Sequence, residues 1–244
     1  MGVFAVTGGS GGIGARTVML LKNKGHETIN LDWKKGDIES DLSTPEGRQE
    51  AIDELHALCP EGLDGLICCA GVSGACGDLR RIVSLNFFGT ISLIKGNYDL
   101  LLKKGGTCVV TTSNTISQGN LRMDLADLLN NNNDDEQRIL NLVGRLDQTS
   151  LSVGDSVYAA AKYALARWVR RHSASYAANG VRINAVAPGN VNTAMTATMS
   201  TNAKMALNAL PIPTKYGKET LMDPEEVAQV IVFLSSPEAR GING

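Results

Sequence analysis

Short apolar runs alternate with longer amphipathic stretches along most of this chain. The apolar runs resemble strands buried on both faces and cover residues 3–7, 27–32, 63–71, 105–113 and 181–189, with 37–41 as a weaker candidate. Helical periodicity covers residues 13–25, 44–59, 78–103 and 156–180. The second of these begins with a Thr-Pro pair, which is typical of a helix start.

This alternation predicts an α/β fold, a Rossmann-like doubly wound parallel sheet with helices on both faces. A ligand crevice is expected at the carboxyl ends of the strands. The chain has 244 residues and 43% hydrophobic content, which suits one core, so we expect a single domain over residues 1–244.

Residues 114–154 interrupt the alternation. We expect a helical hairpin inserted between the strand at 105–113, the fifth when the weaker candidate is counted, and the next helix, above the sheet, with Ile139, Leu142, Val143 and Leu146 on one face. The hairpin is equally well explained as a cap without chemistry and as a contact for substrate or a second subunit.

A glycine-rich sequence, TGGSGGIG at residues 7–14, joins the first strand to the first helix. Gly9, Gly11 and Gly14 fit the pattern G-x-G-x-x-G, whereas Gly8, Gly12 and Gly14 fit T-G-x-x-x-G-x-G. Both patterns place flexible backbone and the positive end of a helix beneath an anionic pyrophosphate. The sequence therefore predicts a dinucleotide site at this turn.

Asp32 follows Gly14 by eighteen residues and ends the second strand. A carboxylate there accepts hydrogen bonds from a ribose 2′-hydroxyl and repels a 2′-phosphate, which favours NAD and makes NADP less probable. Lys34 and Lys35 follow closely and are interpreted as charges of a turn rather than as partners of a phosphate.

Tyr158 and Lys162 are four residues apart in a helical segment and therefore project from one face, whereas Tyr163 points about 100° away. A tyrosine has a reference pKa near 10 and needs positive charge nearby to serve as a base at neutral pH. Lys162 is placed to supply that charge.

Bulk composition removes several classes of function. The net charge of −2 argues against nucleic acid as a partner, since such proteins usually carry a basic surplus. The five cysteines lack paired C-x-x-C spacing, so we expect no metal site and a reducing compartment, the cytoplasm. No apolar run reaches the ~18 residues of a membrane span, and no leader segment is visible.

With these landmarks in order, the chain resembles the short-chain dehydrogenase/reductase family over residues 2–240. The positions that match its catalytic group are Asn86, Ser113, Tyr158 and Lys162. The positions that match its cofactor site are Gly8, Ser10, Gly12, Ile13, Gly14, Asp32, Asp41, Leu42, Ala70, Gly71, Tyr158, Lys162, Pro188, Gly189, Val191 and Thr193.

The resemblance implies a role for each catalytic residue. Tyr158 would exchange a proton with the substrate oxygen, and Ser113 would hydrogen-bond that oxygen. Lys162 would also hold the nicotinamide ribose, while Asn86 would position a water that links Lys162 to solvent. The implied activity is NAD(H)-dependent interconversion of a secondary alcohol and a ketone.

Three departures from the family pattern stand out. Its usual N-N-A-G is CCAG here, so any polar bracing by those asparagines is replaced or absent. Only eight residues separate Asp32 from Asp41, too few for the usual helix between the second and third strands. The sequence stops at ARGING, before the V-D-G-G strand of the family, so either the sequence is trimmed or the final edge strand is missing.

The interval of 45 residues between Ser113 and Tyr158 is long for the family and resembles the branch with bacterial 3α-hydroxysteroid dehydrogenase/carbonyl reductase. Residues 189–222 contain Met195, Met199, Met205 and Met222 and are interpreted as a substrate lid for a bulky apolar molecule such as a hydroxysteroid. A poorly ordered loop explains that composition equally well.

Other functions remain open at this point. They are reduction of other carbonyls or 3-oxoacyl thioesters, a non-catalytic dinucleotide-sensing regulator, and a scaffold whose hairpin binds partners. Relatives usually form oligomers through the helix of the tyrosine, and Ala159, Ala160 and Ala161 make that face smooth, so we expect a homo-oligomer, preferably a dimer.

Overall fold

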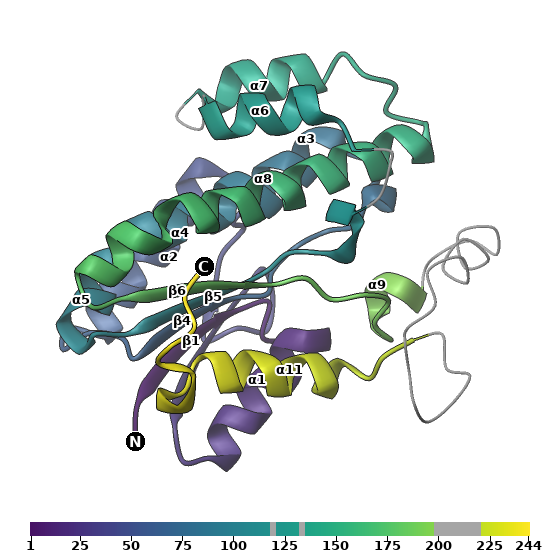
Figure 1. Cartoon of the computed structure of the whole chain (residues 1–244). Coiled ribbons are helices and arrows are strands. Elements are labelled where there is room, and N and C mark those ends of the chain that lie inside the picture. The colour runs from purple at the N-terminus through teal and green to yellow at the C-terminus, as the bar shows by residue number, and fades with distance from the viewer. Residues whose placement is uncertain (118–120, 132–134, 198–220) are drawn as a thin grey trace.

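The computed structural model describes residues 1–117, 121–131, 135–197 and 221–244 (Figure 1). These residues form one parallel sheet of six strands in the order β3-β2-β1-β4-β5-β6. The bounds are β1 Val3–Thr7, β2 Glu27–Asp32, β3 Ile38–Glu39, β4 Gly65–Cys68, β5 Thr107–Thr111 and β6 Arg182–Val186. The predicted doubly wound sheet is confirmed, with its crossover point between β1 and β4.

Successive residues of the central strands enter two separate cores. On β4, Leu66 packs in the core on one side of the sheet and Ile67 in the core on the other. Cys108 and Val109 of β5 divide in the same way. Because side chains alternate across a strand, this explains why the predicted strands are apolar without a gap.

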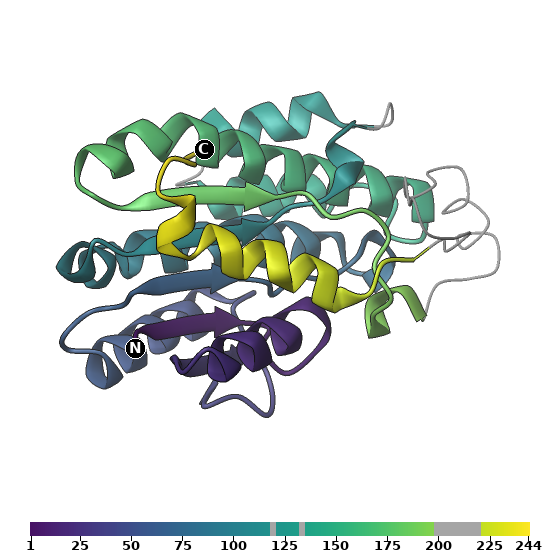
Figure 2. The same ribbon diagram turned by 60° about the horizontal axis from the view of Figure 1, so that its bottom comes forward.

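Helices cover both faces. α1 (Gly12–Asn23) and α11 (Pro224–Leu234) pack side by side on one face (Figure 2). The other face carries α2 (Pro45–Leu58), α4 (Thr90–Gly96), α5 (Tyr98–Lys104) and α8 (Leu151–Ala178) (Figure 1). The start of α2 follows the prediction, since the Thr44 hydroxyl accepts a hydrogen bond from the Gly47 amide.

The single helix predicted over residues 78–103 is wrong. The chain forms α3 (Leu79–Val83), a π-helical turn (Ser84–Gly89), α4 and α5. α4 and α5 are separated at Asn97, whose side-chain amide donates to the Leu93 carbonyl. Such local bonds compete with the helical ladder, and neither they nor a π-helical turn leaves a signal in hydrophobic periodicity.

The helix that carries Tyr158 begins earlier than residue 156. α8 begins at Leu151 because the Ser150 hydroxyl accepts from the Val153 amide and caps it. The three alanines after Tyr158 are buried inside the chain, between 0% and 1% exposed. They therefore do not present the free smooth face that was predicted for an oligomer contact.

The inserted hairpin is present as α6 (Met123–Asn131) and α7 (Glu136–Val143), which lie on the side of α8 away from the sheet (Figure 1). Ile139 and Val143 face inward and are buried, whereas Leu142 is 39% exposed. The four-residue apolar face was thus too broad, because a helix on the outside of the fold buries only a narrow stripe.

The two edges of the sheet correspond to the two remaining departures from the family pattern, the short interval after Asp32 and the final strand. A turn without a helix connects β2 to β3, as the short interval predicted, and Lys35 there has a φ of 61°. At the other edge the final residues lie along β6, where the Gly244 amide donates to the Ile183 carbonyl. Among the described residues β6 is the outermost strand on that side.

Candidate active site

The glycine-rich turn lies between β1 and α1, and its backbone distinguishes the two glycine patterns. Gly8 and Gly12 have φ angles of 68° and 51°, which side chains rarely adopt. A β-carbon at Gly14 would overlap with the Gly8 carbonyl oxygen, whereas one at Gly11 would meet no atom within 4 Å. All three glycines of T-G-x-x-x-G-x-G are therefore required, whereas Gly11 of the other pattern is not, although a β-carbon at Gly9 would also overlap with Asn30 Oδ1.

The turn also fits an anionic group. Gly11 is the N-cap of α1 and provides no side-chain cap, so the first amides of the helix remain available to a ligand. The open space beside Gly11 adjoins those amides. A pyrophosphate is the kind of group that such a cradle holds.

Asp32 contacts this turn directly. Its Oδ2 accepts from the Ser10 amide at 3.0 Å, and its Oδ1 accepts from the Trp33 amide at 2.8 Å. The Lys34 ammonium lies 4.2 Å from the centre of the Trp33 ring, and the Ser10 hydroxyl contacts the carbonyl oxygens of Lys34 and Lys35. The two lysines thus behave as residues of a turn, as predicted.

Asp41 and Leu42 follow β3 and are already engaged within the chain. Burial opposes ionisation of Asp41, but hydrogen bonds from Ser43 and the nearby Arg81 guanidinium outweigh it and lower the Asp41 pKa. Arg81 Nη2 lies 3.2 Å from Asp41 Oδ2. Leu42 is buried, and its carbonyl accepts from Arg48 Nε. An adenine-side role for this pair remains a prediction.

The CCAG sequence after β4 has replacement bracing. The Thr7 hydroxyl accepts from the Cys69 and Ala70 amides at 3.1 and 3.0 Å. The Thr111 hydroxyl approaches Cys69 Sγ at 3.5 Å, which links β5 to the same corner. Hydroxyls of the flanking strands thus hold this corner, a role that the sequence pattern did not reveal.

Ser113, Tyr158 and Lys162 converge at the carboxyl end of β5. Lys162 is 5% exposed, and its Nζ donates to the Thr111 carbonyl at 2.8 Å. The same Nζ lies 5.9 Å from the centre of the Tyr158 ring, as expected for residues one helical turn apart. Ser113 lies just beyond β5, where its hydroxyl accepts from the Thr115 amide at 3.3 Å and lies near enough to the Tyr158 phenol to have a lowering effect on its pKa.

The surroundings of the Tyr158 phenol differ from the expectation that Lys162 alone lowers its pKa. Burial raises the pKa of Tyr158 above its ordinary value, the Ser113 hydrogen bond opposes that rise, and the Asp155 carboxylate adds to it. Lys162 therefore does not by itself make this phenol a strong base. Further positive charge beside the ring is needed to favour the phenolate.

Asn86 lies in the π-helical turn and is fully buried. Its side chain pairs with one backbone unit: the Val72 amide donates to Asn86 Oδ1 at 3.2 Å, and Asn86 Nδ2 donates to the Val72 carbonyl at 3.0 Å. A β-carbon at Gly71 would lie 2.5 Å from Asn86 Oδ1 and 3.5 Å from Lys162 Nζ. Gly71 thus allows Asn86 and Lys162 to approach the same point.

The segment after β6 runs from the neighbourhood of Ser113 to the glycine-rich turn. The Asn114 amide donates to the Pro188 carbonyl at 2.9 Å beside Ser113. At the other end Thr193 lies against Gly12, with its methyl 3.1 Å from where a β-carbon would be. This segment continues into α9 (Ala194–Ala197), and Val191 forms an isolated bridge with Met222.

The predicted lid at residues 189–222 lies largely outside the described residues. Met199 and Met205 belong to that part of the chain, whereas Met195 is described and is 39% exposed. The described residues include the segment predicted to lie over a nicotinamide, with Pro188, Gly189, Val191 and Thr193. Residues 198–220 of the predicted lid are not among them.

Burial of Lys162 has a consequence for stability. Burial lowers the pKa of Lys162 from 10.5 to about 8, so between these values the folded chain binds fewer protons than the unfolded chain. The free energy of unfolding therefore rises with pH across this window. At pH 7 the amine is charged in both states, and its burial is a cost to the fold.

We expect Lys162→Met to leave the thermal midpoint at pH 7 unchanged or higher, since it removes a buried charge while the lost bond to Thr111 offsets part of the gain. That advantage should shrink as the pH rises from about 8 to 10.5. Thermal unfolding without ligand across this range tests it, with the exposed Lys22→Met as control. Equal pH slopes for wild type and Lys162→Met would contradict the assignment.

Comparisons with known proteins agree with this arrangement. The family model described as short chain dehydrogenase matches residues 2–124, and the one described as Enoyl-(Acyl carrier protein) reductase matches residues 125–244. The 3-alpha-hydroxysteroid dehydrogenase/carbonyl reductase of Comamonas testosteroni is 30% identical over 247 residues, covering 100% of this chain and 93% of that protein.

A further relative and a solved structure are also similar to this chain. The 3-oxoacyl-[acyl-carrier-protein] reductase FabG of Vibrio cholerae is 27% identical over 244 residues, covering 99% of this chain and 93% of that protein. The crystal structure of the 3-alpha-hydroxysteroid dehydrogenase from Pseudomonas sp. B-0831, complexed with NADH, superposes with a TM-score of 0.87. It is 33% identical and covers 99% of this chain and 92% of that chain.

Proposed function

Since this chain belongs to the short-chain dehydrogenase/reductase family, we propose that it is an NAD(H)-dependent oxidoreductase that interconverts a secondary alcohol and a ketone. The observation that carries the proposal is the meeting of Ser113, Tyr158 and Lys162 at the end of β5, at the same carboxyl edge of the parallel sheet as the glycine-rich turn. Acid–base groups and a dinucleotide cradle then serve one crevice.

The proposed roles follow from chemistry and position. Tyr158 exchanges the proton with the substrate oxygen, and Ser113, which lies near the phenol, orients that oxygen. Lys162, anchored on the Thr111 carbonyl, holds its ammonium beneath the tyrosine and binds the ribose. Asn86 keeps a path for protons from Lys162 to solvent. The nicotinamide supplies the hydride chemistry and, when oxidised, further positive charge.

The remaining cofactor contacts are proposals of the same kind. The pyrophosphate would lie over the turn and α1, with Asp32 on the ribose and Asp41 and Leu42 towards the base. Ala70, Gly71 and the segment 188–193 would border the ring. This is supported by Gly8, Gly12 and Gly14, whose conformation and packing leave no room for side chains.

We propose NAD rather than NADP because the Asp32 carboxylate faces the Ser10 amide at the end of β2. Asp32→Ala is expected to raise the ratio of kcat/KM for NADP over that for NAD by about tenfold or more, since like charges in contact cost several kcal/mol. Asp37→Asn removes a charge from the same turn but spares the Asp32 contact, and serves as control. An unchanged ratio in Asp32→Ala would reject this role for Asp32.

For the substrate we propose a bulky apolar secondary alcohol or ketone such as a hydroxysteroid. The names of the Comamonas and Pseudomonas relatives support this choice, as does the methionine content of residues 189–222. A 3-oxoacyl thioester is the second candidate, supported by the Vibrio relative. Turnover with NAD on hydroxysteroids, simple alcohols and 3-hydroxyacyl thioesters separates the two.

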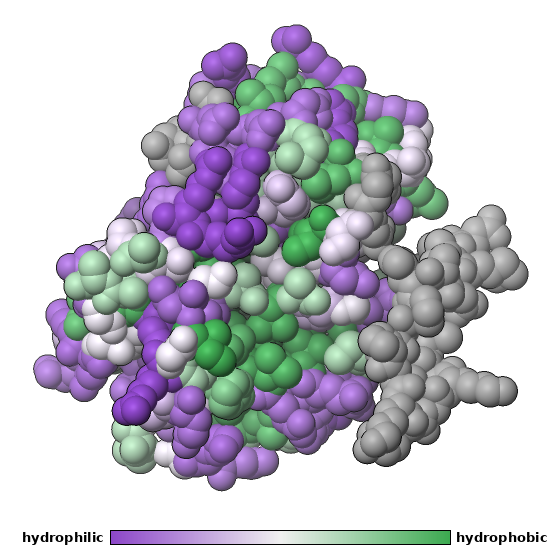
Figure 3. All heavy atoms as spheres, in the orientation of Figure 1, coloured by the Kyte–Doolittle hydropathy of each residue, from purple (hydrophilic) through white to green (hydrophobic). Residues whose placement is uncertain are grey.

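Assembly and location are also proposals. The described residues contain no helix long and apolar enough to span a membrane, and we propose the cytoplasm as the compartment. We further propose a homodimer. Its contact is better sought on α11 than on the buried alanines of α8, because Val230 and Phe233 of α11 are 47% and 45% exposed. Figure 3 shows apolar surface in the region of this helix. Light scattering that gives the mass of one chain would reject the dimer.

A further inference from the structure

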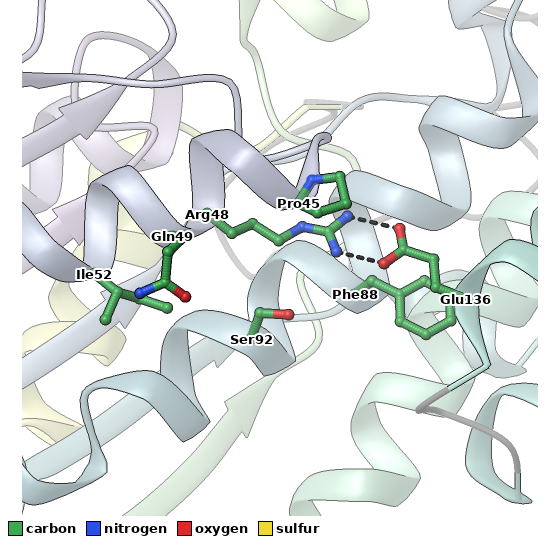
Figure 4. A pocket seen from close by; sticks show the side chains of 7 residues that line it. All are labelled: Pro45, Arg48, Gln49, Ile52, Phe88, Ser92 and Glu136. Atoms are coloured by element: carbon green, nitrogen blue, oxygen red, sulfur yellow. Dashed lines mark hydrogen bonds and ion pairs between the residues drawn. The ribbon is translucent and has the colours of Figure 1, made fainter.

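An ion pair between a buried arginine and a glutamate whose side chain is 20% exposed joins the inserted hairpin to the body of the chain. Arg48 on α2 is 4% exposed, and Glu136 is the first residue of α7. Arg48 Nη1 lies 2.5 Å from Glu136 Oε2, and Nη2 lies 2.8 Å from Oε1, a two-pronged contact (Figure 4). Such pairs fix both position and orientation.

The same pair holds the start of the π-helical turn. Ser84 Oγ lies 2.5 Å from Glu136 Oε1 and accepts from Arg48 Nη2 at 2.6 Å. Arg48 Nη2 also lies 3.1 Å from the Ser84 carbonyl. Glu136 thus contacts Ser84, the first residue of the turn, both directly and through Arg48.

That turn carries Asn86 two residues later. Asn86 is fixed to the Val72 backbone on one side, and its Oδ1 borders Gly71, which in turn borders Lys162. Ser84 and Asn86 therefore belong to one turn, and we expect a displacement of Ser84 to shift Asn86. π-helical turns are often found at functional sites, where they set the direction of a side chain.

A pocket adjoins the ion pair and the turn. Pro45, Arg48, Gln49, Ile52, Phe88, Ser92 and Glu136 line an open pocket of about 320 Å³ (Figure 4). Phe88 belongs to the π-helical turn, so the turn, although buried, meets this pocket at one residue. Removal of the glutamate charge leaves the buried arginine charge uncompensated, which favours rearrangement.

We propose that Glu136 of the inserted hairpin is a positioning residue, which acts through Arg48 and Ser84 on the π-helical turn and so sets the position of Asn86. The kinetic part of this inference rests on the proposed function. It gives the hairpin a role in the reaction that needs no contact with substrate or with a second subunit.

The test compares Glu136→Gln with Asp127→Asn. Both remove one carboxylate of the hairpin that is paired with an arginine of the body, since Asp127 Oδ1 lies 2.7 Å from Arg167 Nη1 on α8. Only Glu136 touches the π-helical turn. Asp127→Asn therefore controls for general loosening of the hairpin.

We expect Glu136→Gln to lower kcat by about tenfold, less than the ~10²-fold that a misplacement of 1 Å can cost, with KM and the Kd for NADH within about twofold of wild type. The solvent deuterium isotope effect on kcat should increase, because proton transfer becomes slower. Asp127→Asn should match wild type in all four quantities. Wild-type kcat and isotope effect in Glu136→Gln, or the same loss in both variants, would overturn the inference.

Amide hydrogen exchange provides a readout that does not depend on turnover. Peptides covering residues 71–72 and 84–90 should exchange faster in Glu136→Gln than in wild type and Asp127→Asn, and unchanged exchange would overturn the inference. If the wild type turns over no substrate, the proposed function fails. The exchange comparison still shows whether Glu136 holds the π-helical turn in place. If Glu136→Gln does not fold, Ser84→Ala, which spares the ion pair, should show the same faster exchange and overturns the inference if it does not.

Discussion

Tyr158→Phe is expected to lower kcat by about 10²–10⁴-fold while the Kd for NADH stays within about twofold of wild type. The change removes one oxygen, the group proposed to exchange the proton, and leaves a ring of the same shape on α8. Ser113 and Lys162 keep their backbone positions, so binding of the dinucleotide should persist. Steady-state turnover and a fluorescence titration with NADH measure the two effects separately.

Tyr163→Phe is the matched control for this experiment. Tyr163 is the next tyrosine on the same helix, half-buried, with the Arg167 guanidinium 5.6 Å from its ring centre. It receives the same chemical change but faces away from Ser113, so its turnover should equal that of wild type. Comparable turnover in Tyr158→Phe and wild type would remove the phenol from the mechanism.

Gly14→Ala is expected to abolish saturable binding of NAD and to destabilise the fold. The added methyl would overlap with the Gly8 carbonyl, a backbone atom that cannot turn aside. Such overpacking costs up to about 3 kcal/mol, which lowers the thermal midpoint by roughly 6–12 °C in a domain of this size. Thermal unfolding and titration with NAD provide the two measurements.

Gly11→Ala is the control in the same turn. Gly11 is exposed, has a φ of −154°, and its added methyl would meet no atom within 4 Å. Its thermal midpoint should remain within a few degrees of wild type, since Ala in place of Gly at an N-cap costs only about 1 kcal/mol. A large loss in Gly11→Ala would favour G-x-G-x-x-G, whereas no loss in Gly14→Ala would contradict both patterns, since they share this glycine.

Much of this fold follows from hydrophobic periodicity alone. Parallel strands buried on both faces appear as continuous apolar runs, and helices between them must cover those faces, so the order of elements predicts the sheet. The short interval from Asp32 to Asp41 likewise excluded a helix by length. These predictions depend on near neighbours in the sequence, which is why they are confirmed.

The predictions from the sequence failed where polar contacts, either local or between distant residues, determine the helix boundaries and the packing. A side-chain cap from Ser150 begins α8 early, Asn97 separates α4 from α5, and the π-helical turn at Asn86 leaves the apolar pattern unchanged. The Arg48–Glu136 pair joins residues that are 88 positions apart and was not foreseen. Arginine and glutamate are common on helix surfaces, so only the fold reveals that these two are paired.

The catalytic roles of Asn86, Ser113, Tyr158 and Lys162 remain predictions, although the structure brings these residues to one place. Sequence spacing could place Tyr158 and Lys162 on one face. It could not reveal that burial raises the pKa of Tyr158 and lowers that of Lys162. Electrostatic balance depends on every neighbouring group, most of which are distant in the chain.

The most direct test of this account is formation of NADH by the purified chain with NAD and a panel of hydroxysteroids and smaller secondary alcohols, repeated with NADP. The account predicts turnover with NAD on a bulky apolar secondary alcohol, higher kcat/KM with NAD than with NADP, and loss of that turnover in Tyr158→Phe. Tight, saturable binding of NAD with no oxidation of any alcohol in the panel would contradict it and favour a dinucleotide-sensing regulator.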